Sequence, residues 1–159
     1  MQDINNLLQL LMGSQTEFVL IGGYACVVHG ASQITRDLDI CGPMNPPFIQ
    51  KLRTTLKDVN PKHRLNPNSK VSFLVEPQNL DQVKNLYLET DLGIIDIVSE
   101  VTGVGNYARV VQSAVEIKLF EQKVKVICVE DLISSYKKLK RDKDKLALHE
   151  LMAIQSLKK

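Results

Sequence analysis

The sequence contains no apolar run that approaches the ~18 consecutive residues a helix needs to cross a bilayer. No basic stretch precedes an apolar segment near the first residue, so no secretory leader is predicted. The sequence also lacks a large excess of either charge, because 20 basic side chains nearly balance 18 acidic ones and the formal net charge is +2. This balance argues against a strong electrostatic nucleic-acid binder, although it leaves a local basic patch open.

Cysteine is rare and has no ligand spacing. The three cysteines, Cys26, Cys41 and Cys128, lie in apolar segments and form no Cys-x-x-Cys pair. An odd number of thiols in such surroundings fits reduced, buried side chains better than a disulfide framework or a zinc site. Together these absences predict a soluble cytoplasmic protein with no membrane partner.

What is present is the composition of an ordinary globular domain. Hydrophobic side chains make up 44% of the 159 residues and charged ones 24%, which is enough for a buried core. No linker-like stretch, internal repeat or low-complexity tract divides the chain, so we expect one domain over residues 1–159. Its core is expected at about 16–129, followed by a helical C-terminal segment at about 130–157.

Short apolar runs and helical periodicity alternate along the chain. Strands are predicted at 18–21, 38–41, 84–90 and 94–98, and a hairpin at 115–120 and 124–129 with its turn at 121–123. Helices are predicted at 5–12, 24–29, 48–56, 107–114 and beyond 130, with a loop at 60–70. Because strands and helices mix without strict alternation, the pattern favours the α+β class, with a mixed β-sheet flanked by helices.

Three aspartates lie in or beside predicted strands, where a charge is costly. Asp37 and Asp39 are two positions apart, so they point to the same face of an extended strand. Asp96 lies between Ile94-Ile95 and Ile97-Val98, whose apolar character predicts burial. A buried charge without compensation costs several kcal/mol. A divalent metal held by all three carboxylates would offset this cost, and hard oxygen ligands favour Mg²⁺ or Mn²⁺.

Simpler explanations remain open for each carboxylate alone. An Asp-x-Asp pair is common in turns and at solvated strand edges. Asp96 could instead form an ion pair across the sheet with Lys118 or Lys125. The metal interpretation therefore depends on all three aspartates lying together.

A glycine pair precedes the carboxylates, at the predicted junction of a buried strand and a helix. Gly22 and Gly23 let the backbone approach a ligand closely and leave N–H groups free at a helix start, which favours phosphate. The spacing matches neither Gly-x-Gly-x-x-Gly nor a P-loop, which disfavours a dinucleotide-binding fold and a P-loop NTPase. A phosphate cradle followed by a metal-binding carboxylate pair indicates nucleoside triphosphate chemistry.

These motifs resemble those of polymerase-beta-type nucleotidyltransferases. The matching segments are Leu20-Ile21-Gly22-Gly23-Tyr24-Ala25, Thr35-Arg36-Asp37-Leu38-Asp39-Ile40 and Gly93-Ile94-Ile95-Asp96-Ile97. The chain is most similar to the small stand-alone Gly-Gly group, which includes antibiotic nucleotidyltransferases and abortive-infection toxin-type enzymes. Segments 126–133 and 141–144 also resemble that group, so the likeness extends over roughly 18–152.

The resemblance implies transfer of a nucleoside monophosphate from an NTP to a hydroxyl of a small molecule or RNA, with release of pyrophosphate. It implies that Asp37, Asp39 and Asp96 are catalytic and bind Mg²⁺, as two ions, with Mn²⁺ as a possible substitute. Asp96 would complete the second metal site or act as general base on the acceptor hydroxyl. The nucleotide-binding residues would be Gly22, Gly23, Thr35, Arg36, Lys137 and Arg141.

Partners and alternatives follow from the short chain. A chain of 159 residues has no second domain for a large acceptor, so the acceptor is expected to be small, or to be held by a homodimer or a protein partner. The alternative function is a non-catalytic binding module of the same fold, or one component of a toxin–antitoxin pair.

The chain departs from the resemblance at three positions. Gly23 and Arg36 stand where many members have serine, and Thr35 precedes Arg36. Tyr136 stands where related chains have a lysine, and Lys137 follows it, about 100° around a helix.

Other polar residues have weaker patterns. The spacing of His29, His63 and His149 fits no ligand motif and predicts structural or surface roles, with His29 nearest the glycine pair. The basic run over 137–145 could bind a nucleic acid or an acidic partner, but a solvated helix face is the more common explanation.

Overall fold

A computed structural model of the chain describes residues 3–66 and 68–157, so Pro67 of the predicted loop lies outside the described residues. The elements follow in the order α1 (Ile4–Gly13), β1 (Val19–Ile21), α2 (Gly22–Val28), β2 (Asp37–Cys41), α3 (Pro46–Leu56), η1 (Lys57–Val59), β3 (Lys62–His63), β4 (Asn85–Thr90), β5 (Gly93–Val98), β6 (Glu100–Val101), β7 (Gly105–Asn106), α4 (Tyr107–Ser113), β8 (Val115–Leu119), β9 (Gln122–Val126), α5 (Val129–Leu139), η2 (Asp142–Asp144) and α6 (Lys145–Leu157).

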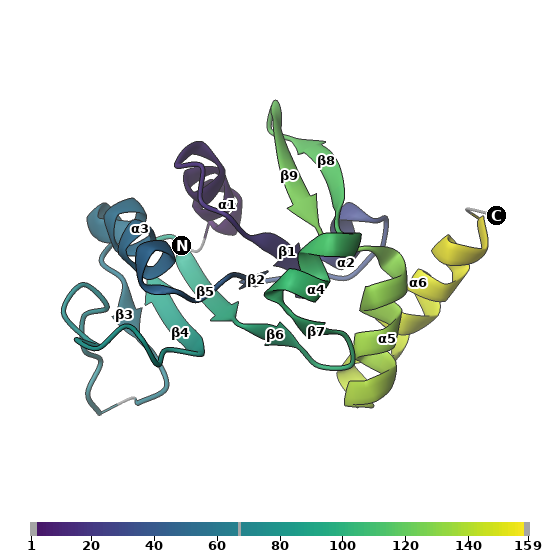
Figure 1. The fold of residues 1–159 in the computed structure, drawn as a ribbon. Coiled ribbons are helices and arrows are strands. Elements are labelled where there is room, and N and C mark those ends of the chain that lie inside the picture. The colour runs from purple at the N-terminus through teal and green to yellow at the C-terminus, as the bar shows by residue number, and fades with distance from the viewer. Residues whose placement is uncertain (1–2, 67, 158–159) are drawn as a thin grey trace.

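Seven of the strands form one mixed sheet, in the order β3-β4-β5-β2-β1-β9-β8 (Figure 1). The pairs β2–β5 and β1–β9 are parallel, whereas the other neighbours are antiparallel. β6 and β7 form a separate two-stranded ribbon. The predicted α+β class with a mixed sheet is therefore confirmed.

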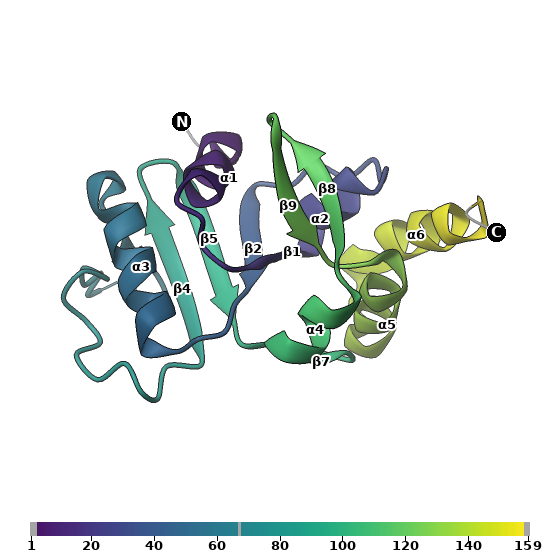
Figure 2. The same ribbon diagram turned by 45° about the horizontal axis from the view of Figure 1, so that its top comes forward.

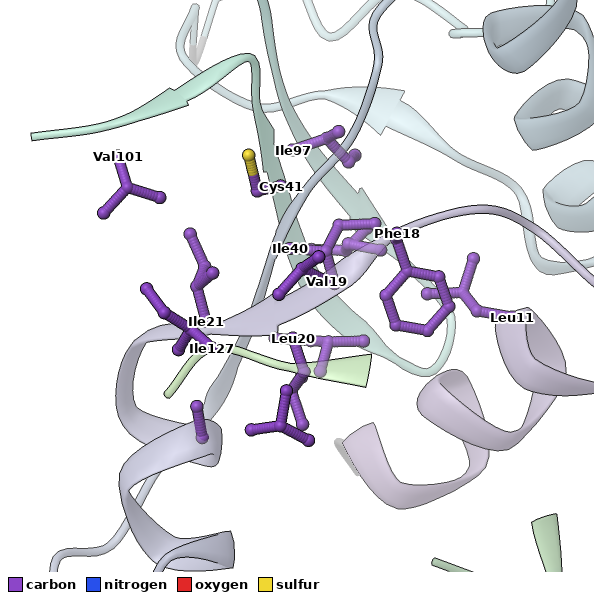
Figure 3. Packing of buried hydrophobic residues seen from close by; sticks show 14 of the residues in the cluster. Leu11, Phe18, Val19, Leu20, Ile21, Ile40, Cys41, Ile97, Val101 and Ile127 are labelled. Carbon is purple, nitrogen blue, oxygen red and sulfur yellow. The ribbon is translucent and has the colours of Figure 1, made fainter. Parts of the chain in front are cut away.

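Most of the core lies on one face of the central strands, and Val19 and Cys41 extend it on the other face. In β2 the side chains of Leu38 and Ile40 are fully buried, whereas Asp37 and Asp39 are half-buried on the opposite face. α1 packs against β2 and β5 and contributes Leu11 to the same core. Figure 3 shows Leu11 beside Phe18, and residues of β1 next to Ile40. On the other face, the part around Asp37 and Asp39 is open and lines a cavity.

The helices α5 and α6 pack against each other at the end of the molecule opposite α3 and β4 (Figure 2). α5 also contacts α2, the helix that follows β1. The predicted helical segment after 130 is thus present, broken by a short turn at Lys140, whose φ is +54°. No helix in the described ranges is long and apolar enough to span a bilayer.

The segment between β3 and β4 is anchored by two side chains. The Arg53 guanidinium donates hydrogen bonds to the carbonyls of Phe73 (2.7 Å) and Pro77 (2.6 Å), and it lies over the Phe73 ring. A ring nitrogen of His63 bonds the carbonyl of Glu76 at 2.7 Å. His63 therefore has the structural role predicted for it.

Four local predictions were wrong. The strand predicted at 124–129 ends at Val126, and Val129 already begins α5. The predicted loop at 60–70 contains β3, a two-residue strand that pairs with β4. The hairpin turn is Phe120-Glu121, so residues 122 and 123 belong to β9. α2 begins at Gly22, two residues earlier than predicted, which places both glycines inside its first turn.

Candidate active site

The three aspartates lie on one face of adjacent strands. The parallel pairing of β2 with β5 places Asp39 opposite Asp96, and Asp37 opposite Ile94. Along each strand these residues alternate with the fully buried Leu38 and Ile95, so all three carboxylates point away from the core. The expected arrangement of the carboxylates on neighbouring strands is present.

The aspartates line a cavity of about 650 Å³, which lies within the range of ~300–1,000 Å³ typical of ligand pockets. The lining comes from the aspartate strands, the glycine pair, the β6 region, α5 and the turn that follows α5. Its polar lining comprises Gly22, Gly23, Gln33, Asp37, Asp39, Arg64, Asp96, Glu100, Thr102, Ser135, Tyr136, Arg141, Lys143 and Asp144.

Gly22 lets the main chain lie directly against Asp39. Its φ of +69° is left-handed, a conformation that costs side-chain-bearing residues about 1–2 kcal/mol. A Cβ on this residue would lie 2.5 Å from Oδ2 of Asp39. The position therefore requires glycine for both its backbone conformation and its space.

Gly23 is explained by a neighbour that the sequence did not indicate. A Cβ here would lie 2.7 Å from the Gln33 side-chain nitrogen and 3.1 Å from Oγ1 of Thr35. The Thr35 hydroxyl donates to the carbonyl of Asp37 at 3.1 Å, which fixes the entry to β2. Thr35 thus packs behind the glycine pair, and the Gln33 amide fills the space that a serine at position 23 would need.

Asp96 is paired with Arg64, a residue that the sequence pattern did not single out. Nη2 of Arg64 donates to both carboxylate oxygens at 2.6 and 2.8 Å, and Nε donates at 3.2 Å. The predicted alternative, an ion pair with Lys118 or Lys125, is wrong because β8 and β9 are separated from β5 by β2 and β1. No local sequence signal links Arg64 to Asp96, because the two residues are 32 positions apart and meet only through the pairing of strands.

Burial and neighbouring like charges determine the electrostatics of this face. Burial, then the nearby Asp96 and Asp37, raise the pKa of Asp39 from 3.8 to about 7. Burial also raises the pKa of Asp96, although the hydrogen bonds from Arg64 oppose this shift. The apo site therefore holds negative charge at a cost that a bound cation would lower.

The donor set fits a hard divalent cation, because oxygen ligands on a crowded anionic face are what Mg²⁺ and Mn²⁺ prefer. The carboxylates of Asp37 and Asp39 accept no hydrogen bond from the described part of the chain, so their oxygens are open to a ligand. Across residues 3–66 and 68–157, however, no three His, Cys, Asp or Glu side chains converge enough to hold a metal as they stand. The third carboxylate, Asp96, is turned to Arg64.

The cationic wall of the cavity is formed by Arg141 and Lys143. Arg141 is bound to Asp144, the buried acid of the turn after α5. Lys137, predicted to bind nucleotide, is exposed on α5 and does not line the cavity. Tyr136 lines the cavity but is largely buried, and its hydroxyl accepts a hydrogen bond from the Cys26 thiol at 3.3 Å.

The other residues singled out from the sequence lie outside the cavity. Arg36 is exposed at the start of β2 and does not line it. A ring nitrogen of His29 bonds the carbonyl of Ile127 at 2.7 Å, which ties α2 to the end of β9. His149 is exposed on α6. All three cysteines are buried free thiols, as predicted.

No protein-family profile matches the sequence, and no curated protein matches it. Solved structures do match. The lincosamide antibiotic adenylyltransferase LnuA, bound to lincomycin, has 19% identity and a TM-score of 0.65 over 95% of each chain. A Thermotoga maritima protein provisionally assigned as a nucleotidyltransferase has 13% identity and a TM-score of 0.58, over 94% of this chain and 92% of that one.

A third match is an antigenic nucleotidyltransferase-like protein from Paracoccidioides brasiliensis. It has 14% identity and a TM-score of 0.56, and the alignment covers 97% of this chain and 74% of that one. The chain therefore has the nucleotidyltransferase fold, as the sequence motifs predicted. The similarity extends over nearly the whole length of this chain and is not confined to the motifs.

Proposed function

We propose that the chain is a Mg²⁺-dependent nucleotidyltransferase that moves a nucleoside monophosphate from an NTP to an acceptor hydroxyl. The observation that carries this proposal is the position of Asp37, Asp39 and Asp96 on one face of adjacent strands, beside Gly22-Gly23 in one cavity. The fold shared with an adenylyltransferase supports it. The three free, buried thiols fit a reducing compartment such as the cytoplasm.

The reaction exchanges one phosphorus–oxygen bond for another. The acceptor oxygen forms a bond to the α-phosphorus, the bond between the α-phosphorus and the bridging oxygen breaks, and pyrophosphate leaves with that electron pair. The acceptor proton passes to a carboxylate. Asp96 is proposed either to take this proton or to complete a second metal site. When bound, the metal lowers the pKa of the attacking hydroxyl and stabilises the leaving oxygen.

The chain's own residues supply positioning and charge. Asp37 and Asp39 would hold the metal, since their oxygens are open to the cavity. The N–H groups of Gly22 and Gly23, at the start of α2, would bind the triphosphate, and Arg141 with Lys143 would neutralise its charge. Thr35 would act from behind the glycine pair, through its bond to the carbonyl of Asp37.

The acceptor is proposed to be a small molecule or an RNA end. The first is supported by the fold shared with LnuA, a lincosamide antibiotic adenylyltransferase bound to lincomycin. A cavity of about 650 Å³ has room for a ligand of moderate size at its open side. For a larger acceptor, a second copy of the chain or a protein partner is proposed to complete the site.

A thermal-shift titration with each NTP and Mg²⁺ tests the nucleotide site. A ligand that binds only the folded state stabilises it by about 2.7 kcal/mol at 100 times its Kd. We expect that shift in the wild type, and its loss with EDTA and in Asp37→Asn and Asp39→Asn. Asp58→Asn, which changes an exposed aspartate outside the cavity, is the matched control.

Ligand-induced shifts are compared within each variant, because the substitutions themselves alter stability. Release of labelled pyrophosphate with candidate acceptors then measures turnover. If no nucleotide shifts the melting temperature under any condition, the proposal fails and the non-catalytic binding module becomes the better interpretation. A metal-dependent shift without turnover on any acceptor would leave a nucleotide-binding protein.

A further inference from the structure

Arg64 is held over the carboxylate face by its main chain and by its side chain. Its N–H donates to the carbonyl of Tyr87 at 3.0 Å, and its guanidinium lies 5.8 Å from the centre of the Tyr87 ring. Tyr87 is the β4 partner of Asp96, which is in turn the β5 partner of Asp39. Arg64 therefore lies at the end of one row of residues that crosses three strands and includes two of the carboxylates.

The guanidinium uses both oxygens of Asp96. Its two nitrogens donate three hydrogen bonds of 2.6 to 3.2 Å, and the Asp96 side chain is only 16% exposed. A bidentate pair of this kind is stronger than a neutral hydrogen bond and fixes the carboxylate plane. Of the three carboxylates, Asp96 is the one with a cationic partner at hydrogen-bond distance among the described residues.

A metal ion on Asp96 would need the same oxygens. Mg²⁺ binds carboxylate oxygens at about 2.0–2.1 Å, which would bring a divalent charge within a few ångström of the guanidinium. Two cations at that separation repel strongly in a half-buried site. Asp96 can therefore be neutralised by Arg64 or by a metal, but poorly by both at once.

We propose that Arg64 and a divalent metal ion are alternative partners of Asp96, so that Arg64 occupies the third ligand position until a metal displaces it. This inference rests on the proposed metal site and adds a residue that sets its metal affinity. It accounts for the failure of the three aspartates to converge as they stand, because one of them is turned to an arginine. Arg64 lines the cavity and is 26% exposed, so it has room to move aside.

Mn²⁺ binding to the protein without nucleotide, measured by electron paramagnetic resonance, tests the competition. Arg64→Met should bind Mn²⁺ about tenfold or more tightly than the wild type, the ratio expected when charge-assisted hydrogen bonds no longer have to be broken. Arg64→Lys should lie between them, since it keeps the charge and loses the bidentate geometry. Arg109→Met is the matched control, because Arg109 forms a similar pair with Asp131 outside the cavity.

A second pair of variants separates competition from a general change of charge. In the Asp96→Asn background, Arg64→Met should give no gain in Mn²⁺ affinity, since the contested carboxylate is absent. An equal gain in both backgrounds, or unchanged or weaker binding in Arg64→Met, would overturn the inference. If Arg64→Met does not fold, as thermal unfolding in EDTA would show, Arg64→Lys carries the test.

The two proposals fail in different ways. If Mn²⁺ affinity depends on Asp37 and Asp39 but is unchanged by substitution of Arg64, the competition between Arg64 and metal is overturned, and the proposed metal site stands. Absence of Mn²⁺ binding in every variant overturns both proposals.

Discussion

Neutralising Asp39 should stabilise the apo protein while removing a residue proposed to bind metal. The pKa of Asp39 is raised from 3.8 to about 7, by burial first and then by Asp96 and Asp37. The folded protein thus binds a proton on Asp39 more tightly than the unfolded chain does. Protonated Asp39 therefore stabilises the fold compared with ionised Asp39. This contribution is fully present below about pH 4 and is lost as the pH rises through about 7.

The size of the effect follows from the pKa. Each unit of pKa corresponds to about 1.4 kcal/mol, so ionising Asp39 costs the fold about 2–3 kcal/mol more at pH 8.5 than at pH 5, allowing for solvent screening. The carboxamide of Asp39→Asn does not ionise and avoids this cost. The free energy of unfolding of the variant, relative to wild type, should therefore rise by that amount between the two pH values.

Urea denaturation of both proteins in EDTA, from pH 5 to 8.5, measures this difference. With the usual dependence of unfolding free energy on urea, the gap between midpoints should widen by on the order of 1 M. Asp58→Asn, at an exposed site, is expected to give no such widening. A gap between wild type and Asp39→Asn that stays constant over this range would refute the proposed protonation of Asp39.

The remaining predictions concern the glycine pair, the cationic wall and the anchored segment. Gly22→Ala should destabilise the fold by at least about 1–2 kcal/mol in thermal unfolding and remove the nucleotide shift, because φ is +69° and Asp39 fills the space. Gly13→Ala, with no atom near the new methyl group, should do neither, and equal effects would contradict the steric argument. In a binding titration, Lys143→Ala should weaken NTP binding several-fold, whereas Lys137→Ala should not. A larger loss in Lys137→Ala would contradict the assignment of Lys143, and not Lys137, to the nucleotide site. Arg53→Met should lower the free energy of unfolding by about 2–4 kcal/mol, because two charge-assisted hydrogen bonds are lost. Amide hydrogen exchange should increase more in residues 64–84 than in the central strands.

The elements nearest the site were predictable because their signals are local. A buried strand shows either alternating apolar and polar residues or a continuous apolar run, and β1 shows the latter. The glycine pair marks the point where β1 ends and α2 begins. The alternation of Leu38 and Ile40 with the two aspartates fixes which face is polar before any partner is known. The same reasoning applies to β5 around Asp96. These segments therefore located the carboxylates correctly.

The errors arose where structure depends on distant pairing or unusual backbone. The hairpin turn has φ values of +51° at Phe120 and +69° at Glu121, a conformation that usually calls for asparagine or glycine. With neither residue present, no turn signal marked the position. β3 is a strand only because β4 pairs with it. Arg64 follows β3 directly, so its contact with Asp96 could not be predicted without that register.

The charges of the cavity argue that a nucleotide enters together with metal. Among the described residues, five carboxylates and three cationic side chains line it, which leaves a formal excess of two negative charges there. A triphosphate adds several more, so a bare nucleotide would meet repulsion from Asp37 and Asp39 even with Arg141 and Lys143 in the lining. A divalent cation between the carboxylates and the phosphates reverses the sign of that interaction. The nucleotide affinity should therefore collapse without metal, and an NTP that binds equally well in EDTA would contradict the assignment of the aspartates.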